Sequence, residues 1–237
     1  MRAKISAQRR VLKRCCRNYP QLSLEAAAER MQETMALIPA CQTLPKLMGV
    51  EGAAARVYFQ ALPAALRRPM PFQGRNRRPP KDPVNALLSL GYGLLTSELI
   101  GVMVGVGLDP QIGIFHSSRG RMPALAEDML EMFRAPVADA LALSLVNLGV
   151  LQEKDFVTTS EGGVQLSKPA LEVYFKHYRR RMQTPFRNRE GENTTLRLEL
   201  QRLASHLRRV ILQEESFTPY LAQEGGPVRG GNPKVLR

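Results

Sequence analysis

Three side chains in the middle of the chain are of the types that bind a divalent metal ion. His116 follows the apolar run 112–115, Asp128 comes twelve residues later, and Glu131 lies three positions beyond it. Residues three apart share one face of a helix, so both carboxylates can point to one place. A loop histidine folded over that face would give a nitrogen–oxygen site, which suits Mn²⁺ or Mg²⁺. By spacing alone, a structural histidine beside surface acids is equally consistent with the sequence.

A fourth candidate, Glu51, is a carboxylate in an unusual setting. It is followed by Gly52 and three alanines within a helix expected over residues 45–62, and such small side chains let another helix approach closely. Taken alone, an exposed glutamate in an alanine-rich helix is the simpler interpretation. His177 and His206 lie in basic helices, where we expect them to face phosphate or solvent rather than to catalyse.

The charge balance indicates a polyanionic partner, and nucleic acid is favoured over a role in solubility alone. The 237 residues include 34 Lys and Arg against 21 Asp and Glu, a formal net charge of +13, with an ordinary hydrophobic content of 44%. This composition excludes global disorder. The three cysteines are too few and too irregularly spaced for a disulfide framework or a zinc site.

The charge reverses sign in residues 101–150, which contain three basic and five acidic side chains. An acidic region within a basic chain is what a metal-dependent nucleic-acid enzyme needs, because carboxylates bind the metal while basic surface binds phosphate. A solvated acidic helix face would leave the same pattern.

The periodicity predicts an all-α fold of many helices, with one possible β-hairpin near 156–166. We expect a helical domain over residues 1–216, which contains a Pro/Arg-rich linker at 64–82, and an irregular tail at 217–237. The helix over 123–147 should be kinked or broken before Pro136. The other helices are expected at 4–17, 23–37, 45–62, 83–106, 168–183 and 194–213.

The apolar segment 84–107 is long enough to cross a membrane. Asn85, Ser89, Ser97 and Glu98 interrupt it, and a carboxylate inside a membrane is costly. We therefore expect a fully buried helix, no membrane association and a cytoplasmic protein. The first 24 residues carry seven Lys and Arg and no acid, as a transit peptide would, but serine is scarce there.

Four ordered segments carry a resemblance to a known family. They are GVEGAAARVYF at 49–59, FQGRNRRPPKDPVNALLS at 72–89, GLDPQIGIFH at 107–116 and LAEDMLEMFR at 125–134. In this order and spacing they resemble the catalytic, central, histidine and aspartate segments of the CRISPR-associated endonuclease that acts as the integrase of spacer acquisition. Four such motifs together are a far stronger signal than any one of them.

The resemblance implies a metal-binding catalytic triad of Glu51, His116 and Asp128, with Glu131 as a fourth acidic member. It implies an Mn²⁺- or Mg²⁺-dependent DNA endonuclease/integrase that cleaves and joins phosphodiester bonds in antiviral defence. The family forms homodimers that assemble with a small CRISPR adaptation partner subunit. The candidate DNA contacts, which would set affinity rather than sequence choice, are Arg56, Arg75, Arg77, Arg78, Arg119 and Arg121.

The chain departs from the family pattern at its start. Family members usually carry an N-terminal β-rich domain, whereas residues 3–9 already resemble the beginning of the helical part. The chain is then a naturally short form, one half of a split protein or a portion of a fusion, and dimerisation and partner docking stay open. The alternative function is a non-catalytic helical DNA-binding or scaffold protein of the same fold.

The linker arginines give the first testable prediction. Replacing Arg77 and Arg78 with alanine should lower the slope of log affinity against log salt by about one unit per lost phosphate contact. DNA-binding titrations at several salt concentrations measure that slope. An unchanged slope would exclude the linker from the DNA surface.

Overall fold

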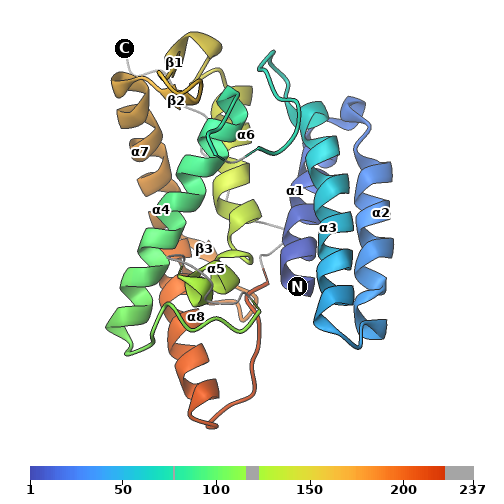
Figure 1. Ribbon diagram of the computed structural model, residues 1–237, viewed down its shortest axis with the longest axis vertical. Coiled ribbons are helices and arrows are strands. Elements are labelled where there is room, and N and C mark those ends of the chain that lie inside the picture. Colours follow the sequence, from blue (N-terminus) through green and yellow to red (C-terminus); the bar gives the residue numbers. More distant parts are fainter. Residues whose placement is uncertain (77, 116–122, 222–237) are drawn as a thin grey trace.

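The structure is a computed structural model that describes residues 1–76, 78–115 and 123–221. It is mostly helical with two short antiparallel strand pairs, which confirms the predicted all-α fold with a small hairpin. Figure 1 shows helices α1 to α3 side by side in one group, and α4, α6, α7 and α8 in a second group.

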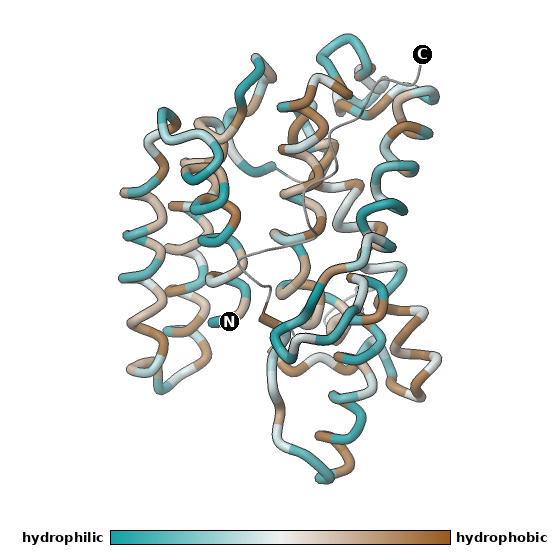
Figure 2. Tube along the Cα trace, turned by 180° about the vertical axis from the view of Figure 1, so that it is seen from behind, coloured by the Kyte–Doolittle hydropathy of each residue, from teal (hydrophilic) through white to brown (hydrophobic). Residues whose placement is uncertain are grey.

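The first group consists of α1 (Arg2–Asn18), α2 (Glu25–Ala36) and α3 (Leu44–Ala61), joined by the 3₁₀ turns η1 (Pro20–Leu22) and η2 (Ile38–Ala40). Helix α1 ends as predicted before Pro20, because the residue that precedes a proline disfavours helical geometry. Ile5, Leu12 and Met31 are fully buried between these helices. Figure 2 shows hydrophilic positions along the outer edge of α2.

After the 3₁₀ turn η3 (Leu62–Ala65), the chain reaches α4 (Pro83–Gly105). Its start is as predicted: the Asp82 side chain caps it by accepting a hydrogen bond of 2.8 Å from the Asn85 N–H.

The expectation that α4 is fully buried is correct only for its first turns. Its C-terminal half buries one stripe, which includes Leu95, Leu99 and Met103, while Val104 is 61% exposed. By length and composition alone α4 could cross a membrane, but the core helix of a soluble protein passes the same test.

The helix expected over 123–147 is broken, as predicted. It forms α5 (Ala124–Leu130), the π-helical segment η4 (Arg134–Asp139) and α6 (Ala140–Asn147). The break precedes Pro136, which has no N–H to donate to the preceding turn. Glu131 therefore stands at the C-terminal end of α5, where the chain changes direction.

The remaining elements pack around α4. The predicted hairpin is present as β1 (Phe156–Thr158) and β2 (Val164–Leu166), preceded by the turn η5 (Glu153–Asp155). Then come α7 (Lys168–Gln183), a second hairpin of β3 (Phe186–Arg187) and β4 (Asn193–Thr194), and α8 (Leu196–Ile211). The second hairpin escaped sequence analysis because its strands have two residues each, too few for an alternating pattern.

Gly91 marks the closest approach of α4 to η4 and α7. A Cβ atom at this position would lie 2.7 Å from the Ala138 Cβ and 2.6 Å from the Tyr174 hydroxyl oxygen. Tyr174 is itself fully buried and donates a hydrogen bond of 3.3 Å to the Leu87 carbonyl. The absence of a side chain at Gly91 therefore sets the distance between these elements.

Gly91→Ala should lower the free energy of unfolding by about 1–3 kcal/mol, because the buried neighbours must shift. Chemical denaturation followed by circular dichroism measures this change. The matched control is Gly93→Ala, where no atom would lie within 4 Å and helix propensity should raise stability by up to about 1 kcal/mol. Equal effects of the two substitutions would contradict the close packing at Gly91.

Candidate active site

The predicted residue Glu51 lies on α3 and faces α1. Its carboxylate accepts a hydrogen bond from the Lys4 ammonium, and the same ammonium lies 2.7 Å from an Oε atom of Glu131. The three side chains are only 21%, 10% and 13% exposed, in the order Glu51, Lys4 and Glu131. The interpretation of Glu51 as an exposed glutamate is therefore wrong, because tertiary packing places it against a buried cation.

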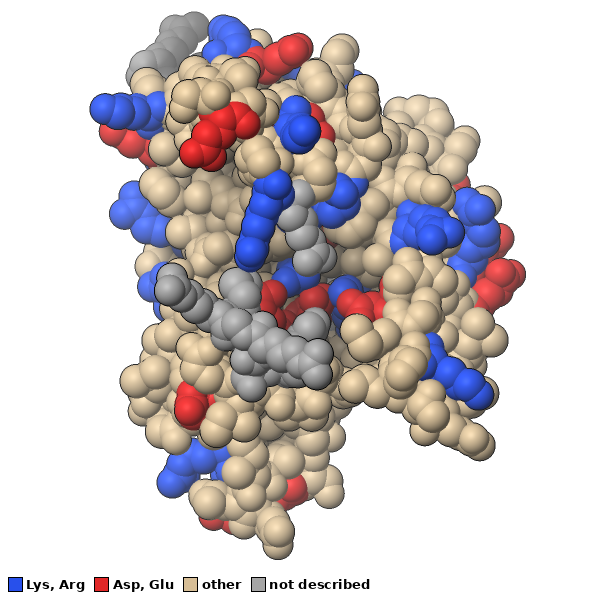
Figure 3. All heavy atoms as spheres, viewed as in Figure 1, with Lys and Arg blue, Asp and Glu red and all other residues tan. Residues whose placement is uncertain are grey.

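The ion pairs continue from Glu131 into η4. Arg134 lies 2.9 Å from Glu131 and 2.6 Å from Glu127, and Thr96 of α4 donates to Glu127 at 3.3 Å. Burial alone would lower the pKa of Arg134, but the carboxylates raise it above its usual value. Glutamate and cation thus alternate from α3 to α4. Figure 3 shows acidic and basic side chains that meet in a hollow near the middle of the face that is viewed.

Asp128 lies on α5 and binds the loop that leads to His116. Its Oδ2 atom accepts hydrogen bonds from the backbone N–H groups of Ile114, at 2.6 Å, and Phe115, at 2.8 Å. The carboxylate therefore fixes the chain immediately before the predicted histidine. His116 itself lies outside the described residues, as do Arg77, Arg119 and Arg121.

The structure brings two of the predicted carboxylates together, because the Lys4 ammonium contacts both Glu51 and Glu131. Asp128 lies on α5, three residues before Glu131. Their oxygens are the hard donors that Mn²⁺ and Mg²⁺ prefer. Within residues 1–76, 78–115 and 123–221, however, no three His, Cys, Asp or Glu side chains are arranged to hold a metal ion.

Asp139, which sequence analysis did not single out, lies beneath this region. It is 1% exposed and accepts hydrogen bonds from Tyr58 of α3, at 2.8 Å, and Tyr92 of α4, at 2.6 Å. Arg134 stacks over the Tyr92 ring at 4.9 Å. Asp139 is therefore linked to the ion pairs through Tyr92, which contacts Arg134. In the sequence, the one sign of Asp139 is an acidic residue within an otherwise apolar segment.

The predicted DNA contacts differ in how the structure presents them. Arg75 donates to Asn85 at 2.8 Å and to Ser89 at 3.3 Å, and its guanidinium lies 5.3 Å from the centre of the Tyr92 ring. Arg56 and Arg78 are exposed. Arg56 and Arg75 line a groove of about 630 Å³ between α3 and the 72–75 segment. Gly52, the residue that follows Glu51, also lines this groove. The groove presents Arg56 to solvent, while Arg75 is anchored in the fold.

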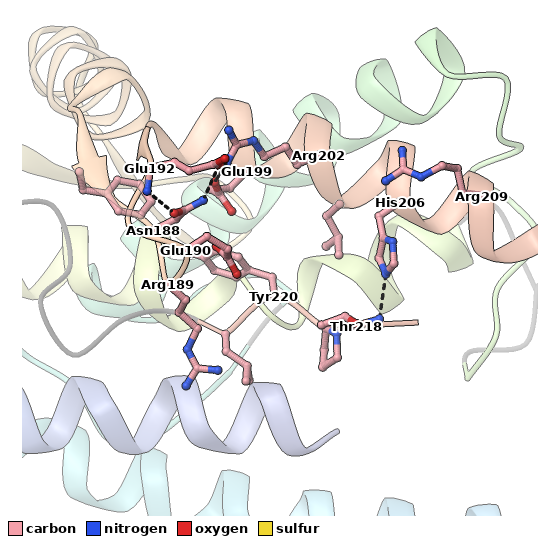
Figure 4. Close-up of a pocket in the computed structure, with 14 residues that line it drawn as sticks. Asn188, Arg189, Glu190, Glu192, Glu199, Arg202, His206, Arg209, Thr218 and Tyr220 are labelled. Atoms are coloured by element: carbon pink, nitrogen blue, oxygen red, sulfur yellow. Dashed lines mark hydrogen bonds and ion pairs between the residues drawn. The ribbon is translucent and has the colours of Figure 1, made fainter. Parts of the chain in front are cut away.

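A second pocket, of about 480 Å³, lies between α8, the β3–β4 hairpin and the 218–221 segment (Figure 4). His206 is not simply solvated there: it bonds Glu215 at 2.7 Å and accepts a hydrogen bond of 2.8 Å from the Thr218 N–H. Arg202 lies 2.8 Å from Glu192. These contacts pair the pocket's charges with one another and hold the following segment against α8.

Comparison with known proteins shows which family the chain belongs to. Residues 1–180 match the family model described as CRISPR associated protein Cas1. The chain belongs to the Cas1 family. Relatives include a Cas4/Cas1 fusion from Geobacter sulfurreducens, 42% identical over 65% of this chain and 28% of its own length. Another is an endonuclease Cas1 from Thermus thermophilus, 36% identical over 79% and 59% respectively.

The solved structures agree on the fold of this Cas1 chain. A casposase bound to integration product superimposes with a TM-score of 0.81 at 22% identity, over 92% of this chain and 60% of that one. The Cas6-RT-Cas1–Cas2 complex matches with a TM-score of 0.72 at 28% identity, over 90% and 24%. The chain thus spans less than two thirds of the length of each of these four proteins.

The buried carboxylate Asp139 gives a pH prediction. Burial raises its pKa from 3.8 to about 6, against the two tyrosine hydrogen bonds, so the folded state binds the proton more tightly than the unfolded chain. The contribution of Asp139 to stability must therefore fall as the pH rises from about 4 to about 6.

Relative to Asp139→Asn, the free energy of unfolding of the unchanged protein should fall by about 2 kcal/mol between pH 4 and pH 7. Denaturant unfolding of both proteins across this range measures the difference. Parallel stability curves would contradict a raised pKa at Asp139.

Proposed function

We propose that the chain is the helical catalytic part of a divalent-metal-dependent DNA endonuclease/integrase of CRISPR adaptation. The observation that carries the proposal is that Glu51 of α3 and Glu131 at the end of α5 meet at Lys4, with Asp128 on the same short helix as Glu131. Membership of the Cas1 family supports it, as do relatives named CRISPR-associated endonuclease.

The metal would be held by the triad Glu51, His116 and Asp128, with Glu131 as a fourth acidic member. Bound there, Mn²⁺ or Mg²⁺ would acidify the attacking hydroxyl and stabilise the extra negative charge on the phosphate. Asp128 also accepts hydrogen bonds from the backbone N–H groups of Ile114 and Phe115. Exposed arginines such as Arg56 and Arg78 would bind phosphate and set the salt dependence of DNA affinity.

We further propose that the chain works with DNA in the cytoplasm, as a homodimer and with a partner of the Cas2 type. The similarity to a Cas6-RT-Cas1–Cas2 complex supports the Cas2-type partner. The chain spans only part of its relatives' length, so we propose the homodimer and the Cas2-type partner from the helical part alone.

The alternative, a non-catalytic DNA-binding or scaffold protein, is favoured by one observation. Lys4 fills the place between Glu51 and Glu131 that a metal ion would use. This alternative predicts DNA binding that is insensitive to Mn²⁺ and unaccompanied by turnover.

Incubation of the chain with branched DNA and Mn²⁺ distinguishes these functions. Cleavage or joining should occur, and Glu51→Ala and His116→Ala should each slow it by about a hundredfold or more. Gel electrophoresis of labelled DNA measures the rates, and Glu29→Ala, an exposed glutamate of α2, is the matched control. Absence of any reaction, or full activity in the Glu51 and His116 variants, would support the scaffold function instead.

A further inference from the structure

Lys4 is a buried cation that no part of the sequence analysis assigned a role. It lies in the first turn of α1, is 8% exposed, and lies among charged groups from two other elements. A lysine is almost never buried unless its charge is paired, because removing an ammonium from water is costly. The carboxylates that pair with the Lys4 charge are those of Glu51 and Glu131.

The two carboxylates depend on Lys4 to different extents. Glu131 also pairs with Arg134 at 2.9 Å, so it retains a cation if Lys4 moves away. The ion pair that the described residues give Glu51 is the one with Lys4. Lys4 thus neutralises Glu51 and also screens it from the like charge of Glu131.

We propose that Lys4 is a positioning residue, a built-in counter-ion that holds the Glu51 carboxylate in place and competes with the divalent cation for it. This inference rests on the proposed function, because it takes Glu51 as a metal ligand. A cation that binds Glu51 must displace the ammonium from that oxygen. Lys4 thereby keeps α1 and α3 together before the cation binds and weakens its binding.

Two opposite effects follow from removing the charge. Without metal, Glu51 would be a mostly buried carboxylate with no cation beside it, so the folded state should be less stable. With metal, the competing ammonium would be gone, so the cation should bind more tightly. A lysine with a purely structural role would give the first effect without the second.

The experiment compares Lys4→Met, which keeps the length and apolar stem of the side chain, with the unchanged protein. In EDTA its melting temperature should be lower, and Mn²⁺ should raise it by more than it raises that of the unchanged protein. Calorimetric titration should give an Mn²⁺ dissociation constant about tenfold smaller, which corresponds to about 1.4 kcal/mol. Lys13→Met, at an exposed position of α1, should change neither quantity.

Two results would overturn the inference. One is an Mn²⁺ affinity of Lys4→Met that equals or falls below that of the unchanged protein. The second concerns a variant that is unfolded in EDTA: if Mn²⁺ does not restore its fold, a divalent cation cannot replace the ammonium. If Lys4→Met does not fold, Lys4→Gln, which removes the charge but keeps a polar end, replaces it in the same titrations.

A Glu51→Gln variant separates this inference from the proposed function. If the unchanged protein binds Mn²⁺ and Glu51→Gln does not, the metal site stands, and the Lys4 variants alone decide the role of Lys4. If neither the unchanged protein nor Lys4→Met binds Mn²⁺, the metal site and the counter-ion role both fail.

Discussion

The structure depends on one line of alternating buried charges. Glu51, Lys4, Glu131 and Arg134 each lie next to a group of opposite sign. Partly buried charges are tolerated only when paired, and removal of one partner typically costs about 3–5 kcal/mol. Because these residues come from α1, α3 and the chain between α5 and η4, their pairing also joins the two helix groups. The side chains that we propose for function are therefore also ones that hold the fold together.

The line of charges continues into the π-helical segment. Arg134, the first residue of that segment, pairs with both Glu127 and Glu131. The segment also places Asp139 under the tyrosines of α3 and α4. A π-helical insertion is frequent at functional sites, and here it joins three elements beneath the carboxylates.

The likeness to longer relatives gives these contacts a context. The helical part alone reproduces the fold of a casposase and of a Cas1 chain in a larger complex, although it spans less than two thirds of the length of either protein. The proposed metal ligands Glu51 and Asp128 lie within the residues matched by the family model, whereas the β3–β4 hairpin and the pocket beside α8 lie beyond residue 180. The segment that follows α8 returns to the core, where Tyr220 stacks on Phe133 at 4.4 Å.

Sequence alone determined the local features and the identities of the acids. The predicted ranges place the C-terminal end of α1 within one residue and the start of α4 correctly, and the four motifs selected Glu51, Asp128 and Glu131. These features depend on residues adjacent in the chain, so their patterns can be read directly. The roles of Lys4, Arg134 and Asp139 were decided only by the tertiary structure. Lys4 and Glu51 are 47 residues apart and Tyr58 and Asp139 are 81 apart, and neither spacing nor composition encodes such contacts. The partial exposure of α4 has the same origin, because a helix's apolar content does not specify which neighbours cover it.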